Sequence, residues 1–177
     1  MLTDIELWEK TQAYHGHSCS GLAIGYKAAI YAKELLDITF SQDEEVVCVI
    51  ENDACGLDAL PIILGCSVGK GNLLLRLRGK QAYSVFNRKT GKSVRLVFKG
   101  RDFGDISPDE RRDALLRIPH SELFEVKEVG FDIPEMAKLF QSIVCEGCGE
   151  TAAENYIRLQ EGRKLCLDCH EPYSRFI

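Results

Sequence analysis

The order of hydrophobic and polar positions along the chain predicts an α+β fold. Residues 21–36 are mostly small and apolar, which is typical of a largely buried helix, with Lys27 on its solvent side. The uninterrupted β-branched run at residues 46–50 predicts a buried central strand. Apolar and polar residues then alternate on both sides of residues 88–92, which predicts a β-hairpin. We therefore expect a core domain over residues 1–140, in which helices pack on a mixed or antiparallel sheet.

Helix start signals predict shorter helices beside this core. Thr3 begins a capping-box pattern, so we expect a helix within residues 3–13. Ser107 followed by Pro108 is typical of a helix N-terminus. A further strand is expected within residues 123–129. The longest apolar stretches fall far short of the roughly 20 residues that cross a bilayer, so no membrane span is expected.

Cysteine is the residue type that the composition singles out. The chain has 177 residues, a net charge of −5, and eight cysteines beside four histidines. The acidic N-terminal segment lacks the apolar core of a secretion signal, so we expect a cytoplasmic protein. Because the cytoplasm keeps thiols reduced, eight cysteines indicate metal or thiol chemistry rather than disulfides.

Four of the cysteines form a C-x2-C-x17-C-x2-C pattern near the end of the chain. This spacing lies in the range of tetrahedral four-thiolate zinc sites. The segment that carries it, residues 143–177, is too short to fold on an apolar core of its own, so the metal would supply most of its folding energy. We predict a structural zinc ribbon with the ligands Cys145, Cys148, Cys166 and Cys169.

The charge of this ribbon argues against nucleic acid as its partner. Residues 143–177 hold four Lys and Arg against six Asp and Glu, whereas phosphate binding favours positive charge. Its Cys-Gly-Glu and Cys-Leu-Asp-Cys segments resemble the four-cysteine fingers of prokaryotic transcription factors that bind RNA polymerase. A regulatory module whose finger or basic hairpin binds RNA polymerase or nucleic acid is therefore the alternative function.

A second group of metal-type ligands lies near the N-terminus. His15, His17 and Cys19 occupy alternate positions of one short loop, so their side chains point the same way in an extended backbone. Cys19 also precedes a predicted helix, whose free amide groups favour a thiolate. Cys55 follows the predicted central strand, where functional residues are common in α/β architectures.

These residues predict a catalytic type of metal site. His17, Cys19 and Cys55 would supply three ligands and leave one position for water or substrate. His15 is expected as a fourth ligand or proton carrier, so the candidate catalytic residues are Cys19, Cys55 and His15. Zinc fits this donor set, and so does a softer transition metal. A thiol oxidoreductase that acts through Cys19 and Cys55 is a further hypothesis.

Other residues near these motifs leave two interpretations open. Cys48, inside the predicted strand, is expected only to pack, whereas for Cys66 packing and ligand binding are both considered. Polar residues around Cys55 either serve the site, by orienting metal ligands or acting as a general acid or base, or cap the helix that follows. They are Glu51, Asn52, Asp53 and Asp58.

A basic stretch interrupts the otherwise acidic chain. Residues 70–101 contain ten Lys and Arg and no Asp or Glu. A solvated hairpin face paired with acids elsewhere explains this pattern; an anionic cofactor, an acidic partner or nucleic acid would also explain it. Residues 65–72 lack the spacing of a phosphate-binding loop, so we expect a turn that brings Lys70 near the site as a cofactor-binding residue.

Three motifs in order resemble one protein family. They are the sequence His-Gly-His-Ser-Cys-Ser-Gly at residues 15–21 and the segments 51–59 and 65–73. Together they are similar to the signatures of the formylmethanofuran dehydrogenase E-subunit family, although Ser20 stands where that family usually has proline. The resemblance implies an α+β core, a homodimer, a core metal centre on the His and Cys residues, and a terminal zinc ribbon.

The resemblance implies less about activity. In methanogens the family name belongs to a molybdenum- or tungsten-dependent enzyme that reduces CO2 onto methanofuran, with the chemistry in other subunits. We expect a metal-binding protein with an accessory or redox role in one-carbon or molybdenum-associated metabolism. Its expected partners are a second copy of the chain and subunits of such an enzyme, and no reaction is assigned to this chain itself.

Overall fold

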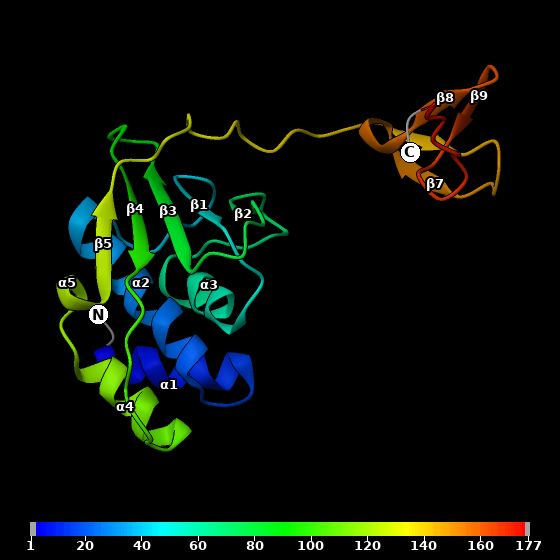
Figure 1. Ribbon diagram of the computed structural model, residues 1–177. Helices are drawn as coiled ribbons and strands as arrows, with labels where there is room; N and C mark the ends of the chain where they lie inside the picture. Colours follow the sequence, from blue (N-terminus) through cyan, green and yellow to red (C-terminus); the bar gives the residue numbers. More distant parts are fainter. Residues whose placement is uncertain (1–2, 176–177) are drawn as a thin grey trace. The chain divides into compact units, whose positions relative to one another are not determined.

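A mixed five-stranded sheet lies at the centre of the N-terminal part of the computed structural model, which describes residues 3–175 (Figure 1). The strands run in the order β2-β1-β3-β4-β5. Strand β2 pairs parallel to β1, and the other neighbours pair antiparallel. The α+β class and the mixed sheet predicted from the sequence are therefore confirmed. The strands are β1 (Val46–Ile50), β2 (Leu73–Leu75), β3 (Ala82–Asn87), β4 (Ser93–Phe98) and β5 (Phe124–Lys127).

Helices cover one face of this sheet (Figure 1). Both predicted capping boxes are present: Thr3 and Glu6 bond each other's backbone at the start of α1, and Ser107 and Glu110 do so at the start of α4. The longest helix, α2, packs against the sheet and against its helical neighbours. The helices are α1 (Asp4–His15), α2 (Ser20–Leu36), the short 3-10 helix η1 (Cys55–Asp58), α3 (Ala59–Ile63), α4 (Pro108–Arg117) and α5 (His120–Leu123).

Strand β1 is buried on both faces, which explains its continuous β-branched sequence. Val46, Cys48 and Ile50 join the main core on the helix side. Val47 and Val49 face the other way, into a small cluster that the chain after β5 covers with Val129 and Phe131. Cys48 is fully buried in this packing, as expected.

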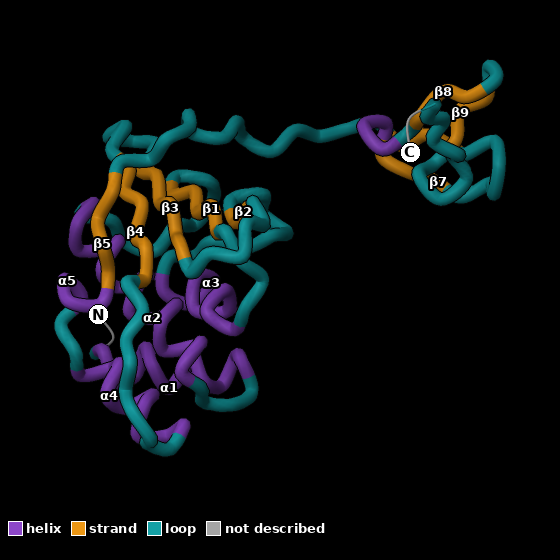
Figure 2. The backbone as a smooth tube through the Cα atoms, viewed as in Figure 1, coloured by secondary structure: helices purple, strands orange, loops and turns teal. Residues whose placement is uncertain are grey.

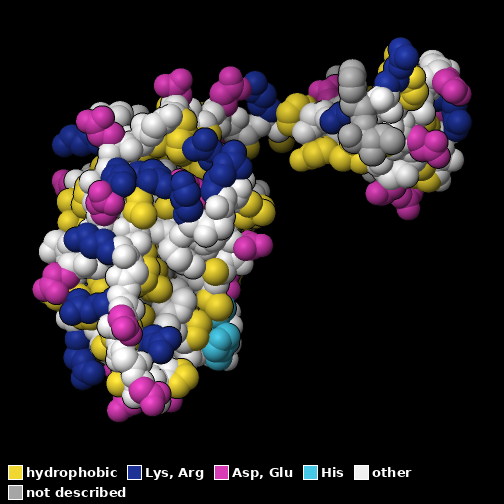
Figure 3. Space-filling view, viewed as in Figure 1, with side chains coloured by type: hydrophobic (Ala, Val, Ile, Leu, Met, Phe, Trp, Pro, Cys, Tyr) yellow, Lys and Arg dark blue, Asp and Glu magenta, His cyan; other side chains and the backbone are white. Residues whose placement is uncertain are grey.

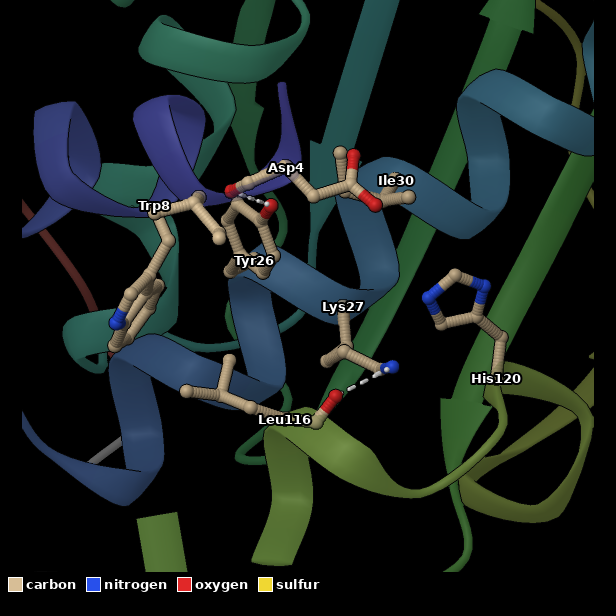
Figure 4. Close-up of a pocket in the computed structure, with 8 residues that line it drawn as sticks. Asp4, Trp8, Tyr26, Lys27, Ile30, Leu116 and His120 are labelled. Atoms are coloured by element: carbon tan, nitrogen blue, oxygen red, sulfur yellow. Dashed lines mark hydrogen bonds between the residues drawn. The ribbon is translucent and has the colours of Figure 1, made fainter. Parts of the chain in front are cut away.

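Lys27 is the clearest difference from the sequence prediction. It was expected on the solvent side of its helix, but only 7% of it is exposed. Its ammonium donates a hydrogen bond to the carbonyl of Leu116 at the end of α4 (3.1 Å), beside a cavity of about 260 Å³ (Figure 4). A chain segment 89 residues away therefore covers a position that helical periodicity alone leaves exposed.

A buried ion pair joins the end of β1 to β4. Glu51 accepts two hydrogen bonds from the Arg95 guanidinium, at 2.7 and 2.9 Å, and only 5% of its side chain is exposed. These hydrogen bonds lower the pKa of Glu51 below its ordinary value of 4.5.

We expect Glu51→Gln to lower the free energy of unfolding by about 3 kcal/mol at pH 7, because Arg95 then lacks its countercharge. A carboxyl whose pKa is lower in the folded state stabilises above its unfolded pKa, and this stabilisation disappears as pH falls through the folded pKa. The stability difference between the two proteins should therefore shrink as pH falls below 4.5. Urea unfolding at a series of pH values measures it; a pH-independent difference would contradict the role of the charge.

The chain divides into two compact units, the first ending at Ala137 and the second beginning at Lys138. Loop connects β5 to the second unit's first strand (Figure 2). Among the described residues of the second unit, Cys145 and Leu165 are the buried hydrophobic side chains. Its elements are β6 (Ser142–Val144), β7 (Thr151–Ala153), the 3-10 helix η2 (Glu154–Tyr156), β8 (Arg158–Gln160) and β9 (Arg163–Leu165), with β6 paired to β7 and β8 to β9.

Within residues 3–175, no helix has both the length and the apolar character that a bilayer span requires.

Candidate metal centres

The four C-terminal cysteines converge in space. Their sulfurs all lie within 4.8 Å of one another, and Cys148 Sγ is 3.9 Å from Cys166 Sγ. Each pair sits on a tight turn: the Gly149 N–H donates to the Cys145 carbonyl (2.9 Å), and the Cys169 N–H donates to the Cys166 carbonyl (3.2 Å). Four thiolates at this spacing form the donor set of a structural zinc ion.

Backbone N–H groups of the two turns stabilise the thiolate of Cys145. Backbone N–H groups of Cys166 and Gly147 donate to Cys145 Sγ, at 3.2 and 3.3 Å. These hydrogen bonds lower the pKa of the Cys145 thiol to about 6, and the bond from the Cys166 N–H has the largest effect. The neighbouring sulfurs, Cys166 first, raise the pKa of Cys169 to about 12. Gly147 is required by this packing, because a Cβ on it would lie 2.9 Å from Cys169 Sγ.

A second group of ligand atoms forms at the turn between α1 and α2. The ligand atoms of His15, His17 and Cys19 all lie within 4.8 Å of one another. Helix α1 ends at His15, and Gly16 reverses the chain with a φ of +87°, a left-handed conformation that glycine adopts without strain. The two imidazole rings stack at a tilt, with centroids 4.4 Å apart.

His15 has the orientation of a metal ligand. Its Nδ1 lies 2.7 Å from a carboxylate oxygen of Asp58 in η1. Its Nε2 is buried and has no hydrogen-bond partner among the described residues. A carboxylate on one ring nitrogen and a metal on the other is the usual arrangement of a ligating histidine. Of the four polar residues singled out around Cys55, Asp58 is thus the one that orients a candidate ligand.

Cys19 caps the N-terminus of α2, and its sulfur accepts a hydrogen bond from the Leu22 N–H (3.3 Å). Cys55 lies beside it, because a Cβ built on Gly21 would be 3.9 Å from Cys19 Sγ and 3.7 Å from Cys55 Sγ. Burial, together with the neighbouring Cys19 thiol, raises the pKa of Cys55. Cys55 is nonetheless outside the group whose ligand atoms all lie within 4.8 Å.

Close backbone contact between α2 and η1 sets these positions. The Gly25 Cα touches Gly56, and a Cβ at Gly25 would overlap the carbonyl group of Gly56. Cys55 and Asp58 belong to the same 3-10 helix as Gly56, so this contact places both of them against the α1–α2 turn. Gly25, four residues after the motif at 15–21, and Gly56, within the segment 51–59, are the sequence signal for this approach.

Lys70 does not join this group. Its ammonium donates to the carbonyls of Ser41, Gln42 and Asp43, at 3.1, 3.3 and 3.4 Å. The parallel register places Leu73 opposite Cys48, so Lys70 lies towards the start of β1, whereas Cys55 follows its end. Lys70 therefore fastens a loop instead of lining the site.

Three further candidate residues have structural contacts. Asn52, which is buried, accepts a hydrogen bond from the Ala54 N–H (3.1 Å) and donates one to the Lys80 carbonyl (2.9 Å). Glu51 pairs with Arg95, as described above. Cys66 is fully buried, its thiol lies 3.5 Å from the Val46 carbonyl, and burial raises its pKa to about 12, which favours packing over ligand binding.

Comparison with known families places each of the two units in a family. Residues 14–125 match the family model described as "FmdE, Molybdenum formylmethanofuran dehydrogenase operon", a range that contains the α1–α2 turn and strands β1 to β4 and ends within β5. The chain belongs to the FmdE family. Residues 138–175 match a prokaryotic dksA/traR C4-type zinc finger, so the C-terminal unit of this family member is a four-cysteine zinc finger.

Two individual proteins are similar to this chain over most of its length. A probable S-adenosyl-L-methionine-binding protein of Archaeoglobus fulgidus is 27% identical over 196 aligned positions, which cover 93% of this chain. The chain spans about half the length of that protein, 52%. The crystal structure of a tungsten formylmethanofuran dehydrogenase FmdE-like protein from Syntrophus aciditrophicus superposes with a TM-score of 0.71. It is 22% identical, with 95% of this chain and 92% of that chain covered, and it shares the fold.

Proposed function

We propose that this FmdE family member binds a transition metal at the α1–α2 turn, in addition to the zinc of its C-terminal finger. The ligands are His15, His17 and Cys19, with Cys55 as the nearby thiol that completes or exchanges into the site. The protein serves an accessory or redox role in one-carbon or molybdenum-associated metabolism.

The main observation behind this proposal is the hydrogen bonding of the two ring nitrogens of His15. Its Nδ1 is held by Asp58 at 2.7 Å, while its Nε2 is buried without a partner among the described residues. An unpaired buried nitrogen is costly unless something binds it. Two neighbouring donors, the His17 imidazole and the Cys19 thiol, lie within 4.8 Å of the ligand atom of His15. A metal ion would satisfy all three at once.

The donor set decides which metals fit. Two imidazoles and a thiolate suit zinc and other borderline or soft ions, and they do not suit magnesium or calcium. When bound, such a metal would act as a Lewis acid or exchange a ligand with substrate. The protein's own contribution is to fix the His15 ring through Asp58 and to orient Cys19 through the α2 amide groups. The role in molybdenum-associated metabolism is supported by the family description alone.

Metal analysis of protein purified without oxygen tests the proposal. We expect about two metal ions per chain, one in each centre. The double variant His17→Ala/Cys19→Ala should retain about one, because the finger does not depend on the α1–α2 turn. Cobalt substitution provides a spectroscopic measure, since a thiolate ligand to cobalt gives an intense charge-transfer band. The double variant should lose the part of this band that comes from the α1–α2 turn.

Cys66→Ala is the matched control, because it removes a buried cysteine outside both centres. It should keep both metals and the same cobalt spectrum. One metal per chain that survives His17→Ala/Cys19→Ala would contradict the proposal and leave the finger as the sole metal site.

A further inference from the structure

A basic cavity lies on the face of the sheet that the helices do not cover. Its volume is about 350 Å³. Figure 3 shows Lys and Arg side chains gathered in a band on this unit. The charged residues that line the cavity are Arg76, Arg78, Lys80 and Arg95, with Glu51 and Glu128.

Strand alternation explains why these charges meet. Val49 in β1 and Leu74 in β2 belong to the small apolar cluster on this face. Side chains two residues apart on a strand point to the same face of a sheet, so Glu51, two residues after Val49, lies on this face. Arg76, two residues after Leu74, lies on it for the same reason. Arg95 pairs with Ser84, which lies opposite Val49, so it falls on this face as well. The apolar cluster thus ends where the charged cavity begins.

The loop that carries three of the cations is fixed to the end of β1. The Arg76 N–H donates to the Ile50 carbonyl (2.9 Å), and the N–H groups of Arg78 and Lys80 both donate to the Glu51 carbonyl (2.9 and 3.2 Å). The cations therefore project from a backbone that is hydrogen-bonded at alternate residues, which is the preorganisation that a binding site needs.

Among the described residues, these three cations form no direct ion pair, although Arg76 and Lys80 lie near enough to Glu51 to help lower its pKa. Arg95 is satisfied by Glu51, but among the described residues no carboxylate forms an ion pair with Arg76, Arg78 or Lys80. The Arg76 guanidinium stacks on the Phe131 ring at 4.7 Å, a contact that leaves its edge N–H groups available. Four cations against two carboxylates leave an excess of two positive charges in the cavity.

We infer that this cavity binds the phosphate monoester of a small molecule. A phosphate monoester carries close to two negative charges at pH 7, which matches the excess, whereas a single carboxylate neutralises half of it. Planar guanidinium groups bind phosphate oxygens with paired hydrogen bonds. Arg76 offers such a pair, and Arg78 offers the N–H groups that remain beside the bond from its Nη1 to the Leu77 carbonyl (2.8 Å). A concave site of this volume fits a terminal phosphate and part of its parent molecule. The inference is independent of the metal site.

Calorimetric titration of the full chain with AMP, and separately with inorganic phosphate, tests this inference at constant ionic strength. We expect saturable 1:1 binding of AMP to the wild-type protein. Arg78→Gln/Lys80→Gln should weaken it by about tenfold or more, because both residues line the cavity. Both are exposed, so the variant should keep its circular dichroism spectrum and melting temperature.

Lys92→Gln/Lys99→Gln is the matched control. It removes the same charge from the same basic stretch but lies outside the cavity, so binding should change less than about twofold. Equal weakening in the two double variants would overturn the inference and indicate general attraction. Absence of saturable binding at millimolar AMP and phosphate would also overturn it. So would tighter binding of an oligothymidylate without terminal phosphates, which would assign the surface to a nucleic-acid backbone.

Discussion

Replacing Cys148 by serine is expected to unfold the C-terminal unit and to leave the N-terminal unit folded. Cys145 and Leu165 are the buried hydrophobic side chains among the described residues of that unit, so it has almost no apolar core. Zinc binding to four thiolates contributes on the order of 10 kcal/mol to the folding of such small modules. Loss of one ligand removes most of that free energy, because the remaining sulfurs cannot complete a tetrahedral site.

Limited proteolysis and metal analysis measure this outcome. The variant should lose one metal ion per chain and become sensitive to protease after residue 138, while the N-terminal unit keeps its melting temperature. His170→Ala is the control, because His170 is next to Cys169 in the sequence but does not belong to the cluster of four ligands. This variant should retain its zinc and its protease resistance. A protease-resistant, zinc-free C-terminal unit would show that hairpin packing alone folds it.

Gly25→Ala is expected to destabilise the N-terminal unit by more than about 4 kcal/mol. At an ordinary helix position this substitution stabilises by up to about 1 kcal/mol, so the sign of the effect is diagnostic. Here the added methyl group would overlap the Gly56 backbone, which no side-chain rotation can relieve. Helix α2 and η1 must separate, and Cys55 and Asp58 move with η1.

Urea unfolding and metal analysis together test this expectation. Where the variant still folds, it should hold the metal proposed at the α1–α2 turn more weakly, because His15 loses its support from Asp58. Gly69→Ala is the control, since a Cβ there meets no atom of residues 3–175 within 4 Å and its backbone is not in the left-handed region. It should leave stability within about 0.5 kcal/mol of the wild type. A stable Gly25→Ala protein with its full metal content would refute the proposed role of the α2–η1 contact.

Features that depend on local sequence could be predicted well. The two capping boxes, the buried run of β1 and the hairpin between β3 and β4 each follow from neighbouring residues. The same holds for the four-cysteine finger, because two C-x2-C turns carry their own geometry. The convergence of His15, His17 and Cys19 was also a local prediction, since five consecutive positions contain all three.

Features that depend on distant packing could not be predicted. Lys27 is buried because Leu116, far along the chain, supplies the acceptor that its ammonium needs. Strand β2 has three leucines and no alternation, so its place at the sheet edge follows only from pairing with β1. Lys70 was expected near the site, but the parallel register of β2 carries it to the opposite end of β1. Asp58 was one of four polar candidates, and only the contact of η1 with α1 selects it.

The hydrogen bonds of Asn52 connect the candidate metal site to the basic cavity on the opposite face of the sheet. This one amide bonds both the segment that leads to Cys55 and the loop that bears Arg78 and Lys80. Asparagine supplies both a donor and an acceptor here, and neither aspartate nor leucine at this position would offer the pair. We therefore expect natural variation at Asn52 to be restricted, because a replacement that keeps one of these two hydrogen bonds would still lose the other.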